Sequence, residues 1–137
     1  MSADPAVRPA YAAVTAAYKL PKGTPEEKAS RREAIQVALA DAMDVPLRTC
    51  RAALAGLEQV ATLEGHCNPN LASDVSVAAT ALGAGIRSAW CNVLVNLRGL
   101  SDPERAARVE AEGAALRARA RELEDAVVTA VDARLST

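Results

Sequence analysis

Phenylalanine is absent from this chain of 137 residues, and the other aromatic side chains are limited to Tyr11, Tyr18 and Trp90. A core built on large rings is therefore excluded. Alanine is instead the commonest residue, with 32 copies, and it is the best helix former. Because Ala, Leu and Val fill a core when helices pack closely, the composition predicts one all-α domain over residues 1–137, an antiparallel helical bundle.

Charges of the two signs are nearly balanced, since the chain has 16 Lys and Arg residues and 17 Asp and Glu residues. Without basic surplus or aromatic rings for base stacking, no nucleic-acid partner is expected. No apolar run approaches the roughly 20 residues of a membrane span, and the N-terminal residues lack the pattern of a secretory signal. Three cysteines, an odd number, fit a reducing compartment. We therefore expect no membrane partner and a cytoplasmic location.

Proline, glycine and helix-capping residues divide the chain into about five expected helices. The best-defined boundary lies at Thr24, which is expected to cap a helix with Pro25 at its first position and Glu27 completing a capping box. Pro46 is expected to stop or kink that helix, because proline cannot donate a backbone hydrogen bond. The expected helices cover about residues 10–18, 25–45, 47–63, 74–97 and 103–135, after an irregular tail at residues 1–9.

The helix expected at residues 74–97 is apolar nearly all round, so it is predicted to be the central helix. One of its faces is small and polar, and consists of Asp74, Ala78, Ala81, Gly85, Ser88, Asn92 and Asn96. This stripe fits either close helix packing, with the asparagines bonded to neighbouring backbone, or one wall of a ligand cleft. A rise of 1.5 Å per residue separates Asp74 from Asn92 by about 27 Å, so only Ser88, Asn92 and Asn96 can form a local cluster.

Other reactive side chains show no recognisable pattern. His66 is the only histidine and lies beside Cys67 in a turn-rich loop, but no CxxC or HxxxH spacing is present, so no metal site is expected. Cys50 and Cys91 fall within expected helices and are predicted to be buried fillers. Lys22 lies in the turn between the first two helices, where it either solvates the turn or receives an anionic ligand.

Several short motifs occur in a specific order along the chain. They are residues 17–28 (AYKLPKGTPEEK), residues 45–47 (VPL), residues 65–70 (GHCNPN) followed by Ser73-Asp74, and residues 92–97 (NVLVNL). In this order they resemble the cyclodeaminase/cyclohydrolase family, which includes formiminotetrahydrofolate cyclodeaminase and methenyltetrahydrofolate cyclohydrolase. The similarity runs from about Tyr11 to the C-terminus.

The resemblance implies an all-helical homodimer or higher oligomer that binds a reduced folate, a tetrahydrofolate derivative, as its substrate. A formimino group is cyclised with loss of ammonia, or a methenyl bridge is opened by water, and both reactions require proton transfer. No prosthetic group, metal or redox cofactor is implied. The candidate ligand-binding residues are Lys22 for the anionic tail, with Asn70, Ser88, Asn92 and Asn96, and the candidate acid/base is Asp74.

Two departures from the family pattern concern the N-terminal residues. The family carries a glycine-rich N-terminal segment with further helices for which this chain has no counterpart, so residues 10–137 are expected to form a partial bundle. The family also places an acidic residue about four positions before the aromatic matching Tyr11, where this chain has Val7 and where Asp4 is out of register. The alternatives to an enzyme are a non-catalytic helical dimerisation or ligand-binding module and a chain completed by another polypeptide.

Overall fold

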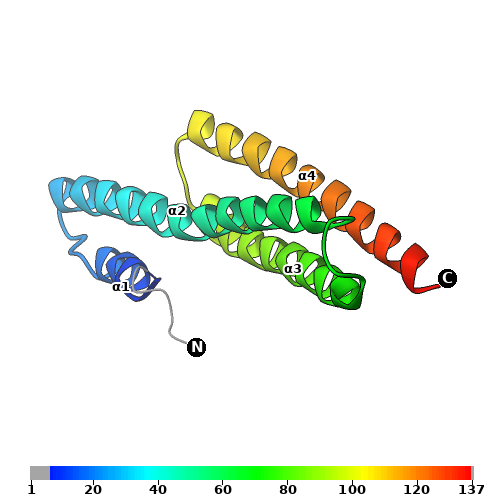
Figure 1. Ribbon diagram of the computed structural model, residues 1–137. Coiled ribbons are helices and arrows are strands. Elements are labelled where there is room, and N and C mark those ends of the chain that lie inside the picture. Colours follow the sequence, from blue (N-terminus) through cyan, green and yellow to red (C-terminus); the bar gives the residue numbers. More distant parts are fainter. Residues whose placement is uncertain (1–6, 137) are drawn as a thin grey trace.

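Four α-helices and one short 3₁₀ helix form the described part of the computed structural model, residues 7–136, which contains no strand (Figure 1). The predicted all-α class is thereby confirmed. The long helices α2 and α3 run antiparallel, and α4 packs against both of them. The elements are α1 (Val7–Tyr18), α2 (Pro25–Leu63), the 3₁₀ helix η1 (Pro69–Leu71), α3 (Ala72–Leu97) and α4 (Pro103–Leu135).

Side-chain caps fix the beginnings of α2 and α4 where the sequence predicts them. The Thr24 hydroxyl accepts the Glu27 N–H at 3.2 Å, and the Glu27 carboxylate accepts the Thr24 N–H at 3.1 Å, which completes the capping box. At α4, the Asp102 carboxylate accepts the N–H groups of Glu104 and Arg105, both at 3.0 Å. These bonds satisfy backbone donors that a helix N-terminus otherwise leaves unpaired.

Pro46 lies inside α2, so the prediction of a helix end at this position is wrong. One long helix replaces two expected ones. The helix continues because Met43, Val45, Leu47 and Cys50 are all buried on either side of the proline. Their packing outweighs the loss of one backbone hydrogen bond. Pro46 has no N–H, however, so the carbonyl of Ala42 lacks its usual donor four residues later.

Two other helices begin earlier than predicted. α1 starts at Val7, so residues 7–9 are helical rather than part of a tail, and Pro9 falls in the first turn, where proline is tolerated. Residues 1–6, which include Asp4, and the Val7 side chain lie outside the described part of the structure. α3 starts at Ala72, after η1, and Asp74 therefore lies in its first turn.

The buried residues form two separate clusters. The larger cluster joins α2, α3 and α4, whereas the smaller one joins α1 to α2 through Ala17, Ile35, Ala38 and Leu39. α2 contacts each of the other three α-helices, but α3 contacts only α2 and α4 among them. The central helix is therefore α2 and not α3, because one side of α3 remains exposed. The larger cluster includes Met43, Leu57, Ile86, Trp90, Val93, Leu116 and Val127.

Gln36 fastens the turn between α3 and α4 to α2. Its amide N–H donates to the carbonyl of Gly99 at 2.9 Å, and its amide oxygen accepts the N–H of Ser101 at 2.7 Å. Both bonds cross more than 60 positions of sequence. These two hydrogen bonds of Gln36 set the register between the antiparallel helices, and they place the C-terminal half of α3 alongside the N-terminal half of α2.

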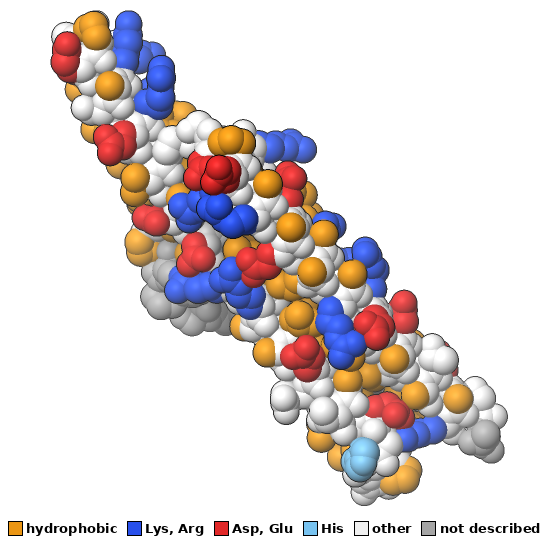
Figure 2. Space-filling model, turned by 90° about the horizontal axis from the view of Figure 1, so that it is seen from above, with side chains coloured by type: hydrophobic (Ala, Val, Ile, Leu, Met, Phe, Trp, Pro, Cys, Tyr) orange, Lys and Arg blue, Asp and Glu red, His pale blue; other side chains and the backbone are white. Residues whose placement is uncertain are grey.

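Charges of both signs are mixed over the face of the molecule shown in Figure 2. The ion pairs on the surface include Arg48 with Asp44 and Arg134 with Glu64. This mixture agrees with the balanced composition. Within residues 7–136, no helix combines the length and the apolar character that a membrane crossing requires.

Candidate functional site

A groove separates α1 from α3, which lie on the same side of α2 (Figure 1). α1 packs on α2 alone among the described helices, so the space between α1 and α3 stays open along α2. Its volume is about 820 Å³, within the range of 300–1,000 Å³ that is typical of small-molecule sites. α1 contributes Ala10, Tyr11, Val14 and Tyr18, α2 contributes Leu39, Ala42, Val45, Pro46 and Thr49, and α3 contributes Gly85, Ser88, Ala89, Asn92, Val95 and Asn96.

The structure brings together three of the predicted ligand-binding residues, Ser88, Asn92 and Asn96, on the α3 wall of the groove. Each follows the previous one after a single helical turn. The Asn92 amide N–H donates to the carbonyl of Ser88 at 3.5 Å, and the Asn96 amide N–H donates to the carbonyl of Asn92 at 3.0 Å. Both asparagines therefore bond to neighbouring backbone, as the first alternative expected, but within residues 7–136 no helix packs closely on the stripe, and its C-terminal half lines the groove. Their amide oxygens remain as acceptors towards a ligand.

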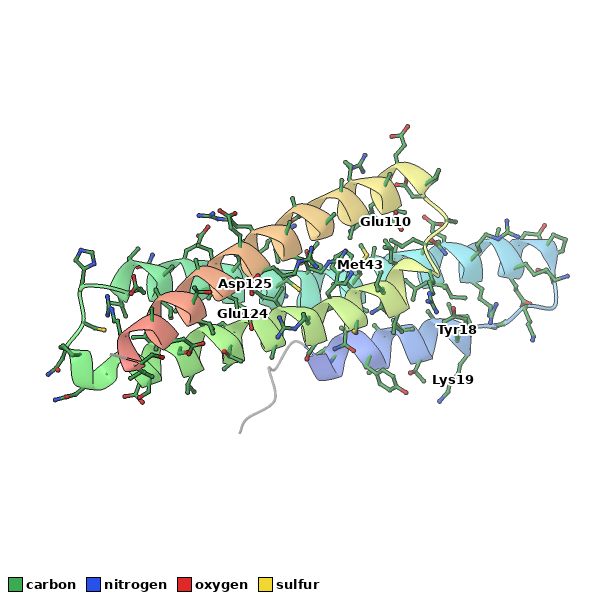
Figure 3. All side chains as sticks on the ribbon, turned by 90° about the vertical axis from the view of Figure 1, so that its right-hand side faces the viewer. Tyr18, Lys19, Met43, Glu110, Glu124 and Asp125 are labelled. Atoms are coloured by element: carbon green, nitrogen blue, oxygen red, sulfur yellow. The ribbon has the colours of Figure 1, made fainter. Side chains whose placement is uncertain are left out.

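None of the described lining residues carries a charged side chain. The floor is apolar at Leu39 and Val45, and the α1 wall presents the rings of Tyr11 and Tyr18. These rings are 75% and 51% exposed, which leaves most of their surface available for contact. Tyr18 lies at the C-terminal end of α1, next to Lys19 (Figure 3). The groove can thus hold an uncharged, flat body and orient it by a few hydrogen bonds.

The remaining predicted site residues lie elsewhere. Lys22 is exposed in the loop between α1 and α2, beyond the end of the groove at Tyr18. Asn70 is in η1, where its N–H donates to the Asn68 side chain at 3.0 Å. Asp74 is exposed in the first turn of α3, where a carboxylate complements the helix dipole. Asn70 and Asp74 therefore lie at the opposite end of α3 from Asn96.

Sequence reasoning missed the α1 wall and the α2 floor of the groove. Tyr11, Val14 and Tyr18 line the groove together, but their spacing along the helix gives no sign of an open side. Thr49 was not singled out at all. Its position inside a helix is a usable signal, since a mid-helix Thr hydroxyl can bond the backbone carbonyl four residues earlier. Here the Thr49 hydroxyl donates to the carbonyl of Val45 at 3.2 Å.

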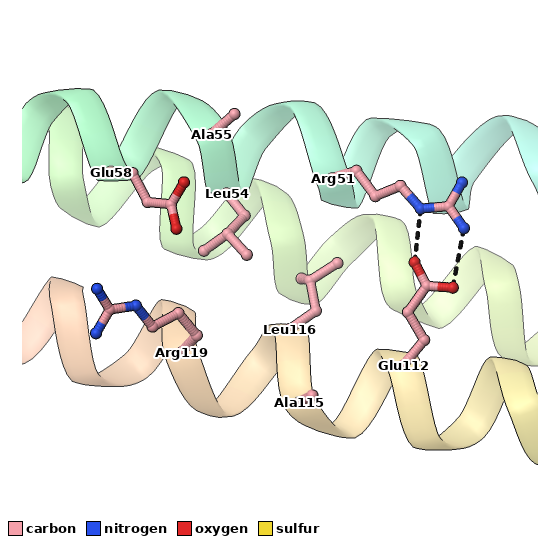
Figure 4. Close-up of a pocket in the computed structure, with 8 residues that line it drawn as sticks. All are labelled: Arg51, Leu54, Ala55, Glu58, Glu112, Ala115, Leu116 and Arg119. Carbon is pink, nitrogen blue, oxygen red and sulfur yellow. Dashed lines mark hydrogen bonds and ion pairs between the residues drawn. The ribbon is translucent and has the colours of Figure 1, made fainter.

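A second, smaller depression of about 410 Å³ lies between α2 and α4 (Figure 4). Leu54 and Leu116 line it, and Arg51 pairs with Glu112 at its edge. The Arg51 guanidinium donates twice to this carboxylate, from Nε at 2.6 Å and from Nη2 at 2.9 Å. These two charges satisfy each other, so the depression is a helix–helix contact rather than a candidate site.

The Arg51–Glu112 pair predicts a pH-dependent contribution to stability. The hydrogen bonds from Arg51 hold the pKa of Glu112 below its ordinary value of 4.5. A carboxylate with a lowered folded-state pKa stabilises the fold above its unfolded pKa and loses this contribution as the pH falls through the folded pKa. Because both side chains are partly exposed, solvent screens the pair, and we expect Glu112→Gln to cost about 0.5 kcal/mol at pH 7.

Urea unfolding of wild type and Glu112→Gln at a series of pH values measures this contribution. The difference between them should shrink as the pH falls below 4.5. Glu110→Gln, on the exposed side of the same helix, is the matched control and should leave stability nearly unchanged at each pH. A Glu112→Gln difference that grows on acidification would contradict the assigned role of this pair.

The three cysteines are free and differ in exposure. Cys50 is fully buried, as predicted, and burial raises the pKa of its thiol, so its reactive thiolate form is suppressed. The prediction that Cys91 is buried is wrong, because it lies on the exposed side of α3. Within the described chain, His, Cys, Asp and Glu side chains form no group of three that could hold a metal ion.

The fold and the site together thus define the protein as an all-helical bundle with a neutral groove between two helices. The chain belongs to the formiminotransferase-cyclodeaminase family, whose model matches residues 7–115. It is 46% identical to the methenyltetrahydrofolate cyclohydrolase of Methylorubrum extorquens over 68% of this chain and 45% of that protein. It is 42% identical to the formimidoyltransferase-cyclodeaminase of Mus musculus over 68% of this chain and 17% of that protein. The predicted family resemblance is confirmed.

The chain spans less than half the length of these two relatives. Its fold is similar to the crystal structure of formiminotetrahydrofolate cyclodeaminase from Thermotoga maritima, with a TM-score of 0.67. That similarity covers 96% of this chain and 59% of the other chain at 24% sequence identity. At this identity the comparison supports the helical fold alone.

Proposed function

We propose that this chain binds a reduced folate in the groove between α1 and α3 and takes part in one-carbon chemistry of the cyclohydrolase or cyclodeaminase type. The observation that carries the proposal is the position of Ser88, Asn92 and Asn96. These residues belong to the motifs shared with the family, or lie next to them, and all three line a groove of about 820 Å³. This volume accommodates a ligand of drug size.

The shape of the groove suggests how a folate would lie. The pyrimidinone half of a reduced pterin is flat and uncharged, so it matches the apolar floor at Leu39 and Val45 and the exposed ring of Tyr11. Tyr18 lines the groove at the end of α1, and the loop that follows carries Lys19 and Lys22. The glutamate tail would leave the groove there, so Lys22 keeps its proposed role with the anionic tail. Asn70 and Asp74, at the other end of α3, would not contact the same folate molecule.

The proposed reactions need proton transfer but no redox step, so we propose no prosthetic group. Opening a methenyl bridge adds one water, and cyclising a formimino group releases one ammonia. The family resemblance assigns the proton transfer to the position of Val7, four residues before Tyr11 in the sequence. Valine cannot transfer a proton, and this favours a second candidate function, folate binding without turnover by this chain alone.

Two measurements on the purified chain separate these candidates. Titration calorimetry with folinic acid, a stable reduced folate, measures binding, and the absorbance of methenyltetrahydrofolate measures hydrolysis. Binding with turnover supports the enzyme, whereas binding with hydrolysis no faster than in buffer supports the binding module. Val7→Glu should then increase hydrolysis, and Arg8→Glu, one position away on the helix, is its matched control. Absence of folinic acid binding would overturn both candidates.

We also propose a homodimer or higher oligomer, or association with a complementing chain, through the exposed side of α3. This side carries few charges, and Val77, which lies outside the groove, is 67% exposed there. Light scattering after size-exclusion chromatography should give a mass above that of one chain. Ala84→Glu, on this side but outside the groove, should lower the mass, while Ala114→Glu on the exposed side of α4 should not. A wild-type protein that stays monomeric would refute self-association.

The proposed location is the cytoplasm. It rests on the three free cysteines, an odd number that fits a reducing compartment. Partners other than a folate and a polypeptide chain are not part of the proposal.

A further inference from the structure

We infer that the backbone carbonyl of Ala42, which Pro46 deprives of its helical donor, accepts a hydrogen bond from the 2-amino group of the bound pterin ring. The inference rests on the proposed function, since it names a contact within the same groove. It makes Pro46 a specificity-determining residue although its own ring donates and accepts no hydrogen bond.

The position of the interruption in α2 is the first argument. Pro46 lies in the interior of a helix of 39 residues, where proline is strongly unfavourable. In an α-helix the carbonyl of each residue points along the axis towards the residue four places later. The Ala42 carbonyl therefore points towards Pro46, which offers no N–H.

The surroundings of this carbonyl are the second argument. Ala42 and Pro46 both line the groove and are only partly buried, while their neighbours Met43, Val45 and Leu47 are buried in the core. The interrupted hydrogen bond therefore lies on the side of α2 that faces the groove, where Val45 also lines the floor, and away from the core contacts of Met43 and Leu47. A backbone acceptor enclosed by a ligand must find a donor, because leaving it unpaired costs free energy.

The hydrogen-bond pattern of the other groove residues is the third argument. Asn92 and Asn96 each donate a side-chain amide N–H to a carbonyl of the α3 backbone. Thr49 donates its hydroxyl hydrogen to the carbonyl of Val45. The two amide oxygens and the Thr49 hydroxyl oxygen therefore stay available as acceptors in the groove. With the Ala42 carbonyl they supply several acceptors beside the hydroxyls of Tyr11, Tyr18 and Ser88, which can donate or accept, so the lining can receive a ligand whose ring edge carries N–H donors. The amino group of a pterin is such a donor.

Pro46→Ala tests the contact, because alanine restores the N–H that occupies the Ala42 carbonyl. We expect a higher melting temperature, since the helix regains a hydrogen bond. We also expect folinic acid to bind about 3- to 10-fold more weakly by calorimetry, as the loss of one hydrogen bond predicts. Pro103→Ala is the matched control at the first position of α4, outside the groove, and should leave folinic acid affinity unchanged.

A second probe isolates the amino group. Wild type should bind folinic acid more tightly than its 2-desamino-2-methyl analogue, and Pro46→Ala should lose most of this preference, because the two changes remove the same hydrogen bond. If Pro46→Ala weakens both probes equally, or weakens neither, the contact is overturned while the folate site stands. If wild type binds neither probe, the proposed function and this contact are both overturned.

Discussion

Replacing Gly113 by alanine is expected to lower the free energy of unfolding by about 2 kcal/mol, although alanine is the better helix former. Gly113 is buried on α4, and a Cβ atom placed there would overlap the six-membered ring of Trp90. Trp90 is only 5% exposed, so its ring has little room to move. The Arg117 guanidinium lies 4.8 Å from the ring centroid, and its Nε donates to the Gly113 carbonyl at 3.0 Å. Overpacking at this contact strains both α3 and α4.

Gly85→Ala provides a matched control for this experiment. It is the same substitution inside a helix, but a Cβ atom at Gly85 has no neighbour within 4 Å. We expect it to raise the free energy of unfolding by about 0.5–1 kcal/mol, because alanine loses less conformational entropy in a helix. Urea unfolding followed by circular dichroism measures both variants. Because Trp90 is the only tryptophan, its fluorescence also reports any displacement in Gly113→Ala. Equal stabilities of the two variants would show that the ring does not pack on Gly113.

Asn92→Leu is expected to weaken folinic acid binding by about 10- to 100-fold, the range that follows when a buried polar group of the ligand loses its partner. Leucine is similar in size to asparagine but cannot accept a hydrogen bond. Within residues 7–136, the Asn92 side-chain amide bonds only to the carbonyl of Ser88, at 3.5 Å, so the fold loses little by the change. The effect should therefore appear in affinity rather than in stability.

Asn70→Leu is the control, because the family resemblance suggests both asparagines as ligand-binding residues. The structure places Asn92 in the groove and Asn70 in η1 at the other end of α3. Calorimetry should give wild-type affinity for Asn70→Leu, and circular dichroism should show that both variants fold. A larger loss of affinity in Asn70→Leu than in Asn92→Leu would place the folate outside the groove.

The local features of the fold could be predicted from the sequence because their causes are local. The capping box at Thr24 and the cap at Asp102 each depend on residues within four positions of one another. The cluster of Ser88, Asn92 and Asn96 follows from helical periodicity alone. The α3 wall of the candidate site can therefore be predicted from the sequence, whereas the α1 wall opposite it cannot.

The features that the sequence did not predict depend on contacts between distant segments. The helix passes through Pro46 because buried neighbours on both sides pack against other helices, and helix propensity contains no information about such packing. Contacts across the bundle, such as Gln36 with Gly99 and Trp90 with Gly113, are equally invisible to periodicity. The exposure of Cys91 also follows from which helices lie beside α3, a property of the whole assembly of helices.

The division of the buried residues into two clusters has a consequence for exchange of backbone amides with solvent. Four buried residues and the bond from Arg31 to the Tyr18 carbonyl hold α1 on α2, whereas seventeen buried residues hold the other helices together. α1 can therefore separate from the bundle at a lower free energy than global unfolding requires. Its amides should exchange first, and a ligand that binds only while α1 is docked would protect them in proportion to its concentration. Deuterium uptake by residues 9–18 thus measures occupancy of the groove without any catalytic readout.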